Sequence, residues 1–281
     1  MSDLATRTLR LYAPGNRALT LGGWLLAGFV VLAVFGPLLA PYNPDAQDLL
    51  SVLGPPDAAH WFGSDELGRD ILSRVIVGTR VTMAIALLPV ALAGIAGVAL
   101  GLVAGFFGGP VDRAISAVVD VLLTIPSLVL AIAIVAVVGA SAQGLIVAIT
   151  LSFIPAIARL VRGRVQELRE EDYIAAAITI GVPRMRILLR HVLPNAASVI
   201  VIQLSLLAGQ AVLIASALGF LGLGVQPPAP EWGAMLGTAR QYIPVAPHVI
   251  VAPGLAIALL VLGFNLLGDG LRDYFDPALT R

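Results

Sequence analysis

The sequence predicts an all-α, polytopic membrane protein with six transmembrane helices and a cytoplasmic helix-turn-helix between the fourth and fifth. Of its 281 residues, 58% are hydrophobic and only 12% are charged. Soluble domains are about 45–50% apolar and about 25% charged, so this chain is too apolar to be one. A membrane helix requires about 17–25 apolar residues, and six apolar runs of this chain are at least that long. They cover residues 19–40, 81–107, 114–139, 144–160, 196–223 and 249–268.

Composition also limits the chemistry of the chain. The formal net charge is zero, so no overall field favours nucleic acid. Because cysteine is absent, disulfides, thiolate metal sites and thiol catalysis are excluded, and we expect no metal. All 17 basic residues are arginine. A Walker A loop needs lysine on the phosphates, so we expect no cofactor here and ATP binding only by partner subunits.

The arginines predict the orientation in the membrane. With both termini inside, 13 arginines fall in inner segments, and the four in outer segments are Arg69, Arg74, Arg80 and Arg240. Positive charge on inner loops is the rule in such proteins, so we expect cytoplasmic termini. Arg7, Arg10 and Arg17 precede the first apolar run. A cleaved signal peptide competes, but the run is too long and no clear cleavage site follows.

A polar segment at 60–80 precedes the second span. We expect Ser64 to cap a helix whose first turn carries Asp65 and Glu66. The pairs Asp65–Arg69 and Asp70–Arg74 have i, i+4 spacing, which predicts ion pairs along a solvated interfacial helix.

Several positions inside the spans suggest how the helices pack. Gly97, Gly101 and Gly105 have small-xxx-small spacing, which predicts close contact with a neighbouring helix. Asp120 lies near the inner end of the third span, where snorkelling or pairing with Arg113 is favoured over a substrate or proton role. Pro155 is expected to bend or weaken the fourth span. For the polar residues of the fifth span, inter-helix hydrogen bonds are favoured over a pore lining: Gln203, Ser205, Gln210 and Ser216.

The segment 167–195 is a polar island between apolar runs and predicts a cytoplasmic docking surface. A first helix through Ile180 ends at Gly181, and Pro183 opens a second helix. One apolar stripe on the second helix contains Met185, Leu188, Leu189 and Val192. We expect Pro194 to end that helix.

The run from Ala175 to Pro194 resembles the cytoplasmic coupling loop of ABC importer permeases, which contains Glu-Ala-Ala-x-x-x-Gly followed by Leu-Pro. Ala176, Ala177 and Gly181 match this pattern, whereas Ala175 stands where the family has glutamate. The resemblance implies that the loop docks in a groove of the ATPase subunit. The implied contact residues are Asp172, Tyr173, Ala175, Ala176, Ala177, Gly181, Arg184 and Pro194.

Further motifs resemble the dipeptide, oligopeptide and nickel branch of these permeases, specifically the second, C-type subunit. The outer motif contains Gly68, Arg69, Asp70 and Arg74, and Pro-Pro-x-Pro-Glu-Trp-Gly follows at 227–233. The C-terminal 268–273 and Asp276-Pro277 also resemble the family. The resemblance implies an N-terminal segment at 1–60 and a five-helix, MetI-like core at 61–281 with the coupling loop at 165–195. Implied partners are a second permease, two ABC ATPases, an extracytoplasmic solute-binding protein and the lipid of the bacterial inner membrane.

Three functions compete. The favoured one is a non-enzymatic permease subunit of an ATP-driven importer of di- or oligopeptides, with nickel or another small solute as the alternative. An ion-coupled secondary transporter needs carboxylates near the membrane midplane, and Asp120 is shallow. An intramembrane protease would need Ser141 and His248 to meet at the outer side, although a small-residue turn and a helix end explain both. The sequence names neither the solute nor the residues of the translocation path.

Overall fold

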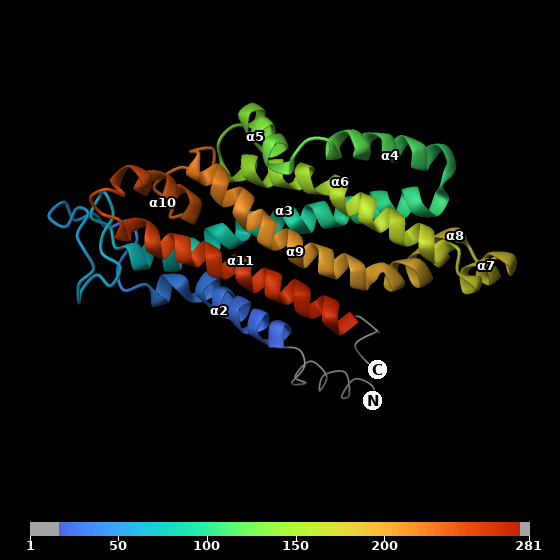
Figure 1. Ribbon diagram of the computed structural model, residues 1–281, viewed down its shortest axis with the longest axis horizontal. Helices are drawn as coiled ribbons and strands as arrows, with labels where there is room; N and C mark the ends of the chain where they lie inside the picture. The colour runs from blue at the N-terminus through green and yellow to red at the C-terminus, as the bar shows by residue number, and fades with distance from the viewer. Residues whose placement is uncertain (1–16, 276–281) are drawn as a thin grey trace.

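The computed structural model describes residues 17–275 and shows an elongated bundle of helices (Figure 1). The long helices are α2 (Arg17–Leu39), α3 (Ile71–Phe107), α6 (Ala142–Arg169), α9 (Leu193–Phe220) and α11 (His248–Phe275). Between α3 and α6 lie α4 (Gly109–Leu123) and α5 (Ser127–Val138). Arg7, Arg10, Asp276 and Pro277 lie outside the described residues.

The described residues contain five helices long and apolar enough to cross a membrane, and α4 with α5 makes a sixth if the pair counts as one span. The third span predicted at 114–139 is not one straight helix, because α4 and α5 meet at 91°. Pro126, which lacks a backbone N–H, precedes α5 with ψ 133° and prevents one helix from running through. In contrast, Pro155 lies inside the continuous helix α6.

Helices α3 and α6 form the centre of the bundle, and glycines allow their close approach. A Cβ atom added at Gly101 would lie 2.7 Å from the Ala158 carbonyl oxygen on α6. Cβ atoms at Gly97 and Gly105 would also meet α6, at 2.7 Å from Ile157 Cβ and 2.8 Å from Arg162 O. The predicted contact of this glycine ridge with a neighbouring helix is confirmed.

Helix α2 lies along α11 at the edge of the bundle and also contacts α3. A Cβ atom at Gly22 would lie 2.6 Å from the Leu267 nitrogen, so the two backbones nearly touch. The outward side of α2 carries exposed Trp24, Val34 and Leu38. Such a bare apolar surface is suited to lipid.

Trp232 joins three helices at the end of the bundle where the long loops lie. It is the first residue of α10 (Trp232–Ala239), and its side chain is fully buried. The indole Nε1 donates a hydrogen bond to the Val75 carbonyl oxygen of α3 at 3.0 Å. Its ring lies 5.8 Å from that of Phe29 on α2. One aromatic side chain therefore joins α2, α3 and α10.

Two of the four polar residues of α9 do not follow the prediction. The Ser205 hydroxyl donates to the Val201 carbonyl of its own helix at 2.9 Å, so the predicted inter-helix hydrogen bond from this residue is wrong. Ser216 is buried, and its Oγ has no hydrogen-bond partner within residues 17–275.

Candidate coupling loop and outer charge cluster

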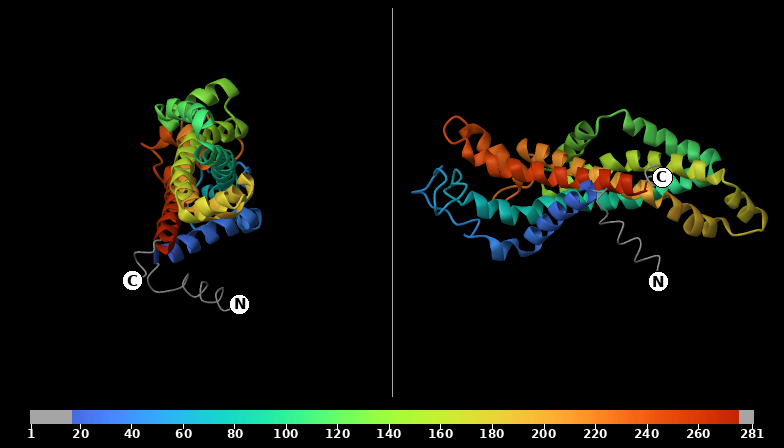
Figure 2. Two further views of the ribbon diagram at one scale, coloured as in Figure 1. Left: turned by 90° about the vertical axis from the view of Figure 1, so that its right-hand side faces the viewer. Right: turned by 60° about the horizontal axis from the view of Figure 1, so that its bottom comes forward.

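The predicted helix-turn-helix is present at one end of the bundle. Helix α6 ends at Arg169, α7 spans Asp172–Thr179 and α8 spans Arg184–Ile187. Figures 1 and 2 show α7 and α8 projecting beyond the other helices, at the end opposite the long loops. Ile174 and Ile187 are fully buried and anchor the projection to the bundle.

Gly181 sets the turn between α7 and α8. Its φ is +80°, a left-handed conformation that favours glycine. The Gly181 N–H donates to the Ile178 carbonyl at 3.0 Å, and the Val182 N–H donates to the Ala177 carbonyl at 3.1 Å. These two bonds form a Schellman motif, which satisfies the last carbonyls of α7.

Pro194 does not end the second helix, so that prediction is wrong. A π-helical turn at Leu188–Val192 links α8 to α9, which continues to Phe220. The Leu193 N–H bonds the Leu188 carbonyl, five residues back. We attribute the π turn to Pro194, which lacks an N–H and cannot complete an ordinary α-helical ladder.

The π turn also divides the predicted apolar stripe. Leu188 and Val192 are buried, whereas Met185 is 56% exposed and Leu189 is 52% exposed. This segment therefore carries exposed apolar side chains on both sides of the turn at Gly181. Besides Met185 and Leu189 they include Ile178 and Ile180, the latter 80% exposed, and the sequence analysis singled out neither isoleucine as a site residue.

The predicted coupling residues lie on α7, the turn at Gly181 and α8, except Pro194, which is the second residue of α9. On α7 and the turn, Ala177 is half-buried. The other predicted residues there are exposed: Asp172, Tyr173, Ala175, Ala176 and Gly181. Arg184 and Pro194 are also exposed. The Asn195 side chain donates to the Tyr173 hydroxyl at 3.3 Å, which ties α7 to the start of α9.

Asp120 is paired across helices α4 and α6. Its partner is Arg159 of α6, so the predicted pairing with Arg113 is wrong. Nearer the loop, Arg162 Nη2 donates to Asp112 at 2.8 Å and links the same two helices. The α4–α6 seam thus has two ion pairs toward the loop end.

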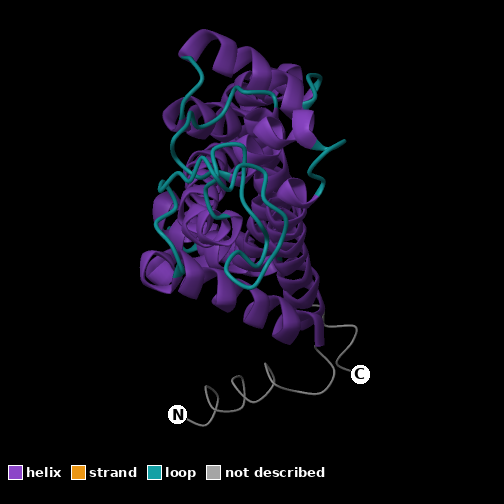
Figure 3. Cartoon of the chain, turned by 90° about the vertical axis from the view of Figure 1, so that its left-hand side faces the viewer, coloured by secondary structure: helices purple, strands orange, loops and turns teal. Residues whose placement is uncertain are grey.

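At the opposite end, loops gather over the ends of the helices (Figure 3). The predicted helix capped by Ser64 is wrong: residues 64–70 form a compact turn, and α3 begins at Ile71 with Asp70 as its N-cap. Asp70 accepts a hydrogen bond from the Ser73 N–H at 2.8 Å. Gly68 has φ +72°, and a Cβ atom there would overlap the Asp48 carbonyl oxygen. A positive φ and a backbone contact therefore favour glycine at this turn.

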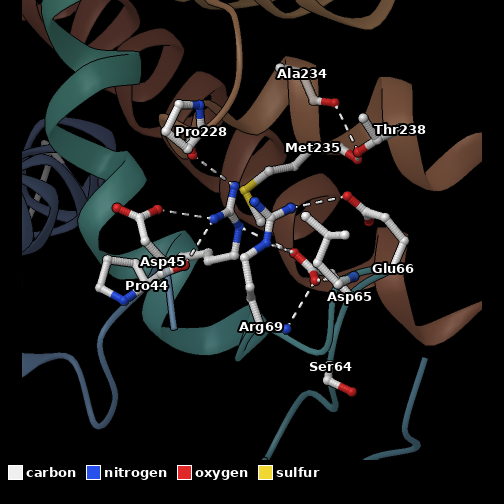
Figure 4. Close-up of polar contacts among 12 residues, drawn as sticks. Pro44, Asp45, Ser64, Asp65, Glu66, Arg69, Pro228, Ala234, Met235 and Thr238 are labelled. Carbon is white, nitrogen blue, oxygen red and sulfur yellow. Dashed lines mark hydrogen bonds and ion pairs between the residues drawn. The ribbon is translucent and has the colours of Figure 1, made fainter. Parts of the chain in front are cut away.

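Asp65 is the centre of a buried charge cluster (Figure 4). Its Oδ1 accepts the backbone N–H groups of Leu67 at 2.9 Å and of Arg69 at 3.0 Å. Its Oδ2 lies 2.7 Å from Arg69 Nε and 3.4 Å from Arg74 Nε. The predicted Asp65–Arg69 pair is confirmed, but the expected solvated setting is wrong because Asp65, Arg69 and Arg74 are at least 95% buried.

The second predicted pair, Asp70–Arg74, is wrong. Asp70 instead lies 2.9 Å from the His60 Nδ1 atom. Arg74 donates to the carbonyl oxygens of Pro44 at 2.9 Å and Pro228 at 3.3 Å. It thereby joins two loops that are far apart in the sequence.

Glu231 is a second buried charge at this end. It caps α10 by accepting the N–H groups of Gly233 and Ala234, each at 2.8 Å. Burial raises the pKa of the Glu231 carboxyl above its ordinary value, although the two backbone hydrogen bonds act in the opposite direction.

The protease alternative has no support in the contacts of its two residues. Ser141 caps α6 by accepting the Gly144 N–H at 3.0 Å. His248 begins α11, and its ring lies beside Gly63. Neither contact joins the hydroxyl to the imidazole.

Comparisons with known proteins agree with this architecture. Residues 97–281 match the family described as binding-protein-dependent transport system inner membrane component, and residues 15–56 match the N-terminal TM domain of oligopeptide transport permease C. The chain is 44% identical to the dipeptide transport system permease protein DppC of Alkalihalophilus pseudofirmus, over 94% of this chain and 87% of DppC. It is 45% identical to the glutathione transport system permease protein GsiD of Pectobacterium atrosepticum, over 89% of this chain and 83% of GsiD.

A solved structure of the methionine ABC transporter MetNI, in an inward-facing conformation, has the same fold. The TM-score is 0.60 at 21% identity, over 73% of this chain and 98% of that chain. The relatives are membrane permease subunits rather than enzymes. The chain therefore belongs to the family of binding-protein-dependent transport system inner membrane components, as a C-type ABC importer permease of the dipeptide and oligopeptide branch.

Proposed function

We propose that this subunit, together with a second homologous permease, forms the path by which di- or oligopeptides cross the bacterial inner membrane. The support for peptides is the identity of 44–45% to permeases named for dipeptide and for glutathione transport. An extracytoplasmic solute-binding protein would deliver the peptide to the end that carries the long loops.

The α7–α8 loop is the proposed contact with one of the two ABC ATPase subunits of the transporter, and its exposed apolar side chains are the observation that carries this assignment. Ile178, Ile180, Met185 and Leu189 are each about half exposed or more, on a segment that projects away from the bundle. An exposed apolar patch with a charged rim is typical of a protein contact, and here Arg184, Arg186 and Arg190 are also exposed.

In this proposal, nucleotide-driven closure of the ATPases moves the loop and shifts the helices between inward and outward openings. The shift in population comes from the different affinities of the ATPases for nucleotide in the two states. Because the chain has no lysine, its own sequence offers no Walker A site.

The proposed orientation places the loop and both termini in the cytoplasm. The excess of arginine in the loop and neighbouring segments supports it. Figure 1 shows the start of α2 and the end of α11 directed toward the side of the bundle that carries α7 and α8.

The test uses the assembled transporter in proteoliposomes. Uptake of radiolabelled dialanine should require ATP and should be insensitive to ionophores. Uptake that persists without ATP and collapses with an ionophore would instead indicate an ion-coupled transporter.

A cross-link tests the coupling loop separately, because the chain has no cysteine and single-cysteine variants are unambiguous. Ala176→Cys should capture an ATPase subunit, whereas Val245→Cys, an exposed position between α10 and α11, should not. Labelling of Ala176→Cys by an impermeant thiol reagent from outside the cell would refute the orientation.

A further inference from the structure

Helices α9 and α11 carry three carboxamide side chains inside apolar spans: Gln203, Gln210 and Asn265. The two helices lie side by side (Figure 1). At about 1.5 Å of rise per residue, each of the three lies about 15 Å from the nearer end of its helix. A Cβ atom at Gly22, in the apolar span of α2, would lie 2.6 Å from the nitrogen of Leu267, close to Asn265 on α11. The three amides are therefore at membrane depth.

These amides gather at the seam between the two helices. Gln203 and Gln210 are seven residues apart, which is two helical turns, so they lie on one face of α9. Gln210 and Asn265 are exposed, and Gln203 is half-buried. A Cβ atom at Gly209 would lie 3.1 Å from the Oδ1 atom of Asn265, so the Asn265 side chain reaches the α9 backbone next to Gln210. We call Gln203, Gln210 and Asn265 the amide stripe.

The side chains of the amide stripe make no hydrogen bond within residues 17–275. A carboxamide has two N–H donors and a carbonyl oxygen that accepts. Hydrocarbon offers no partner for these groups, and an unpaired polar group in an apolar medium is costly. The stripe therefore faces a polar partner rather than lipid.

Other exposed faces of the spans have a different chemistry. On α2, every exposed residue from Leu21 to Leu39 is apolar. On α5, the exposed side chains include Val129, Val137 and Val138. Such faces suit lipid, so the contrast separates a lipid side of the bundle from the side on which the amide stripe lies.

The chemistry of the stripe fits a peptide. Each carboxamide presents a donor and an acceptor, as a peptide group does, so the two can pair whatever side chains the peptide carries. A neutral hydrogen bond makes only a small net contribution in water, and transport requires contacts weak enough for the solute to leave. Three uncharged amides therefore suit a solute that passes rather than one that stays.

We propose that the amide stripe lines the path of the peptide through this subunit and exchanges hydrogen bonds with its peptide groups. For Gln203 and Gln210, this role replaces the inter-helix hydrogen bonds expected from the sequence. The identity of the solute as a peptide rests on the proposed function, whereas the exclusion of lipid rests on the amides themselves.

Single-cysteine variants test whether the stripe faces water, because the chain has no cysteine. Gln210→Cys and Val30→Cys, the latter at a half-exposed position of α2, are reacted in the membrane-embedded complex with a cationic methanethiosulfonate on both sides, with and without ATP. The thiolate is the reactive species and charge is disfavoured in hydrocarbon, so the rate at 210 should exceed that at 30 by about tenfold or more in at least one nucleotide state. Equal rates would overturn the proposal, because contact with lipid or with a helix of the second permease would leave the thiol at 210 inert.

Protection by dialanine tests whether peptides reach the stripe. Dialanine supplied with the solute-binding protein and ATP should slow the reaction at 210 by about twofold at half occupancy of the path. Alanine, which has no peptide group, is the matched control and should not protect. No protection by dialanine, or equal protection by alanine, refutes the contact with the peptide.

Substitution tests the hydrogen bonds themselves. Gln210→Met removes the donors and the acceptor at similar length and should lower dialanine uptake by about twofold to tenfold per assembled complex, whereas Gln210→Asn, which keeps the amide, should retain uptake. If Gln210→Met does not assemble, Asn265→Leu carries the same expectation. Unchanged uptake by the variant that lacks the amide would contradict the proposed role.

The outcome for the amide stripe is separable from that for peptide transport. Dialanine uptake by the unmodified transporter, with an inert thiol at 210, removes this inference and leaves the proposed function in place. Failure of the unmodified transporter to take up dialanine removes the proposed function, and the peptide as ligand of the stripe with it, whatever the reactivity at 210.

Discussion

The contact between α3 and α6 predicts that one methyl group at Gly101 destabilises the protein. In Gly101→Ala the new Cβ would lie 2.7 Å from both the Ala158 oxygen and Val161 Cβ, and 3.0 Å from the Arg162 nitrogen. Two of these atoms belong to the α6 backbone, which cannot turn away as a side chain can. Overpacking of this kind costs about 1–3 kcal/mol.

Gly163→Ala is the matched control, because a Cβ atom there would meet no neighbouring atom within 4 Å. Both changes gain the same helix propensity, about 0.5–1 kcal/mol, so the difference between the two variants isolates the contact. Thermal unfolding of the purified proteins in detergent should place Gly101→Ala below Gly163→Ala by about 1–3 kcal/mol at a common temperature. Equal stability would show that the two backbones do not meet at Gly101.

Three further predictions concern the two ends of the molecule. Gly181→Val should abolish ATP-dependent uptake without loss of membrane insertion, whereas Gly181→Asn, which tolerates φ +80°, should retain uptake; full uptake by the valine variant would contradict this. Arg69→Met should lower the free energy of unfolding by about 1.5–3 kcal/mol because it removes the charged hydrogen bond to buried Asp65 and leaves this carboxylate with the more distant Arg74, at 3.4 Å, while Arg164→Met, from an exposed pair with Glu167, should cost at most about 1 kcal/mol in the same denaturation assay. Because burial raises the pKa of Glu231 in the folded state, this carboxyl contributes most to the free energy of unfolding at pH values below its ordinary pKa of about 4.3, and the contribution is lost as the pH rises. Acidification should therefore stabilise the wild type relative to Glu231→Gln. Parallel pH profiles of the melting temperature for the two proteins would refute the assignment.

Features set by local spacing could be predicted from the sequence. The glycine ridge follows from a four-residue repeat, and the Asp65–Arg69 pair from two charges four residues apart. The turn at Gly181 follows from a glycine two residues before a proline that opens the next helix. Each of these predictions needs only neighbours along the chain, which is why the structure confirms them.

Features set by distant neighbours could not be predicted in this way. Charges at 65–74 are expected to face water because burial of an ion is costly. Here the costs are offset by partners that hydropathy does not reveal, such as the Pro44 and Pro228 carbonyls that accept from Arg74. The same holds for Trp232, whose indole finds its acceptor at Val75. The segment 64–74 therefore contains a buried cluster of charges rather than a solvated helix.

The error at Pro194 has a larger consequence than a displaced helix boundary. A helix that ended there would leave a hinge between the coupling loop and α9. Instead α8, the π turn and α9 form one apolar helical run from Arg184 to Phe220. At its far end a Cβ atom on Gly219 would lie 2.5 Å from Glu231 Oε2, and one on Gly233 would lie 2.5 Å from the Ser216 oxygen. Because α10 is in backbone contact with the far end of this run, one helical run, which includes the π turn at Leu188–Val192, connects the α7–α8 loop to α10.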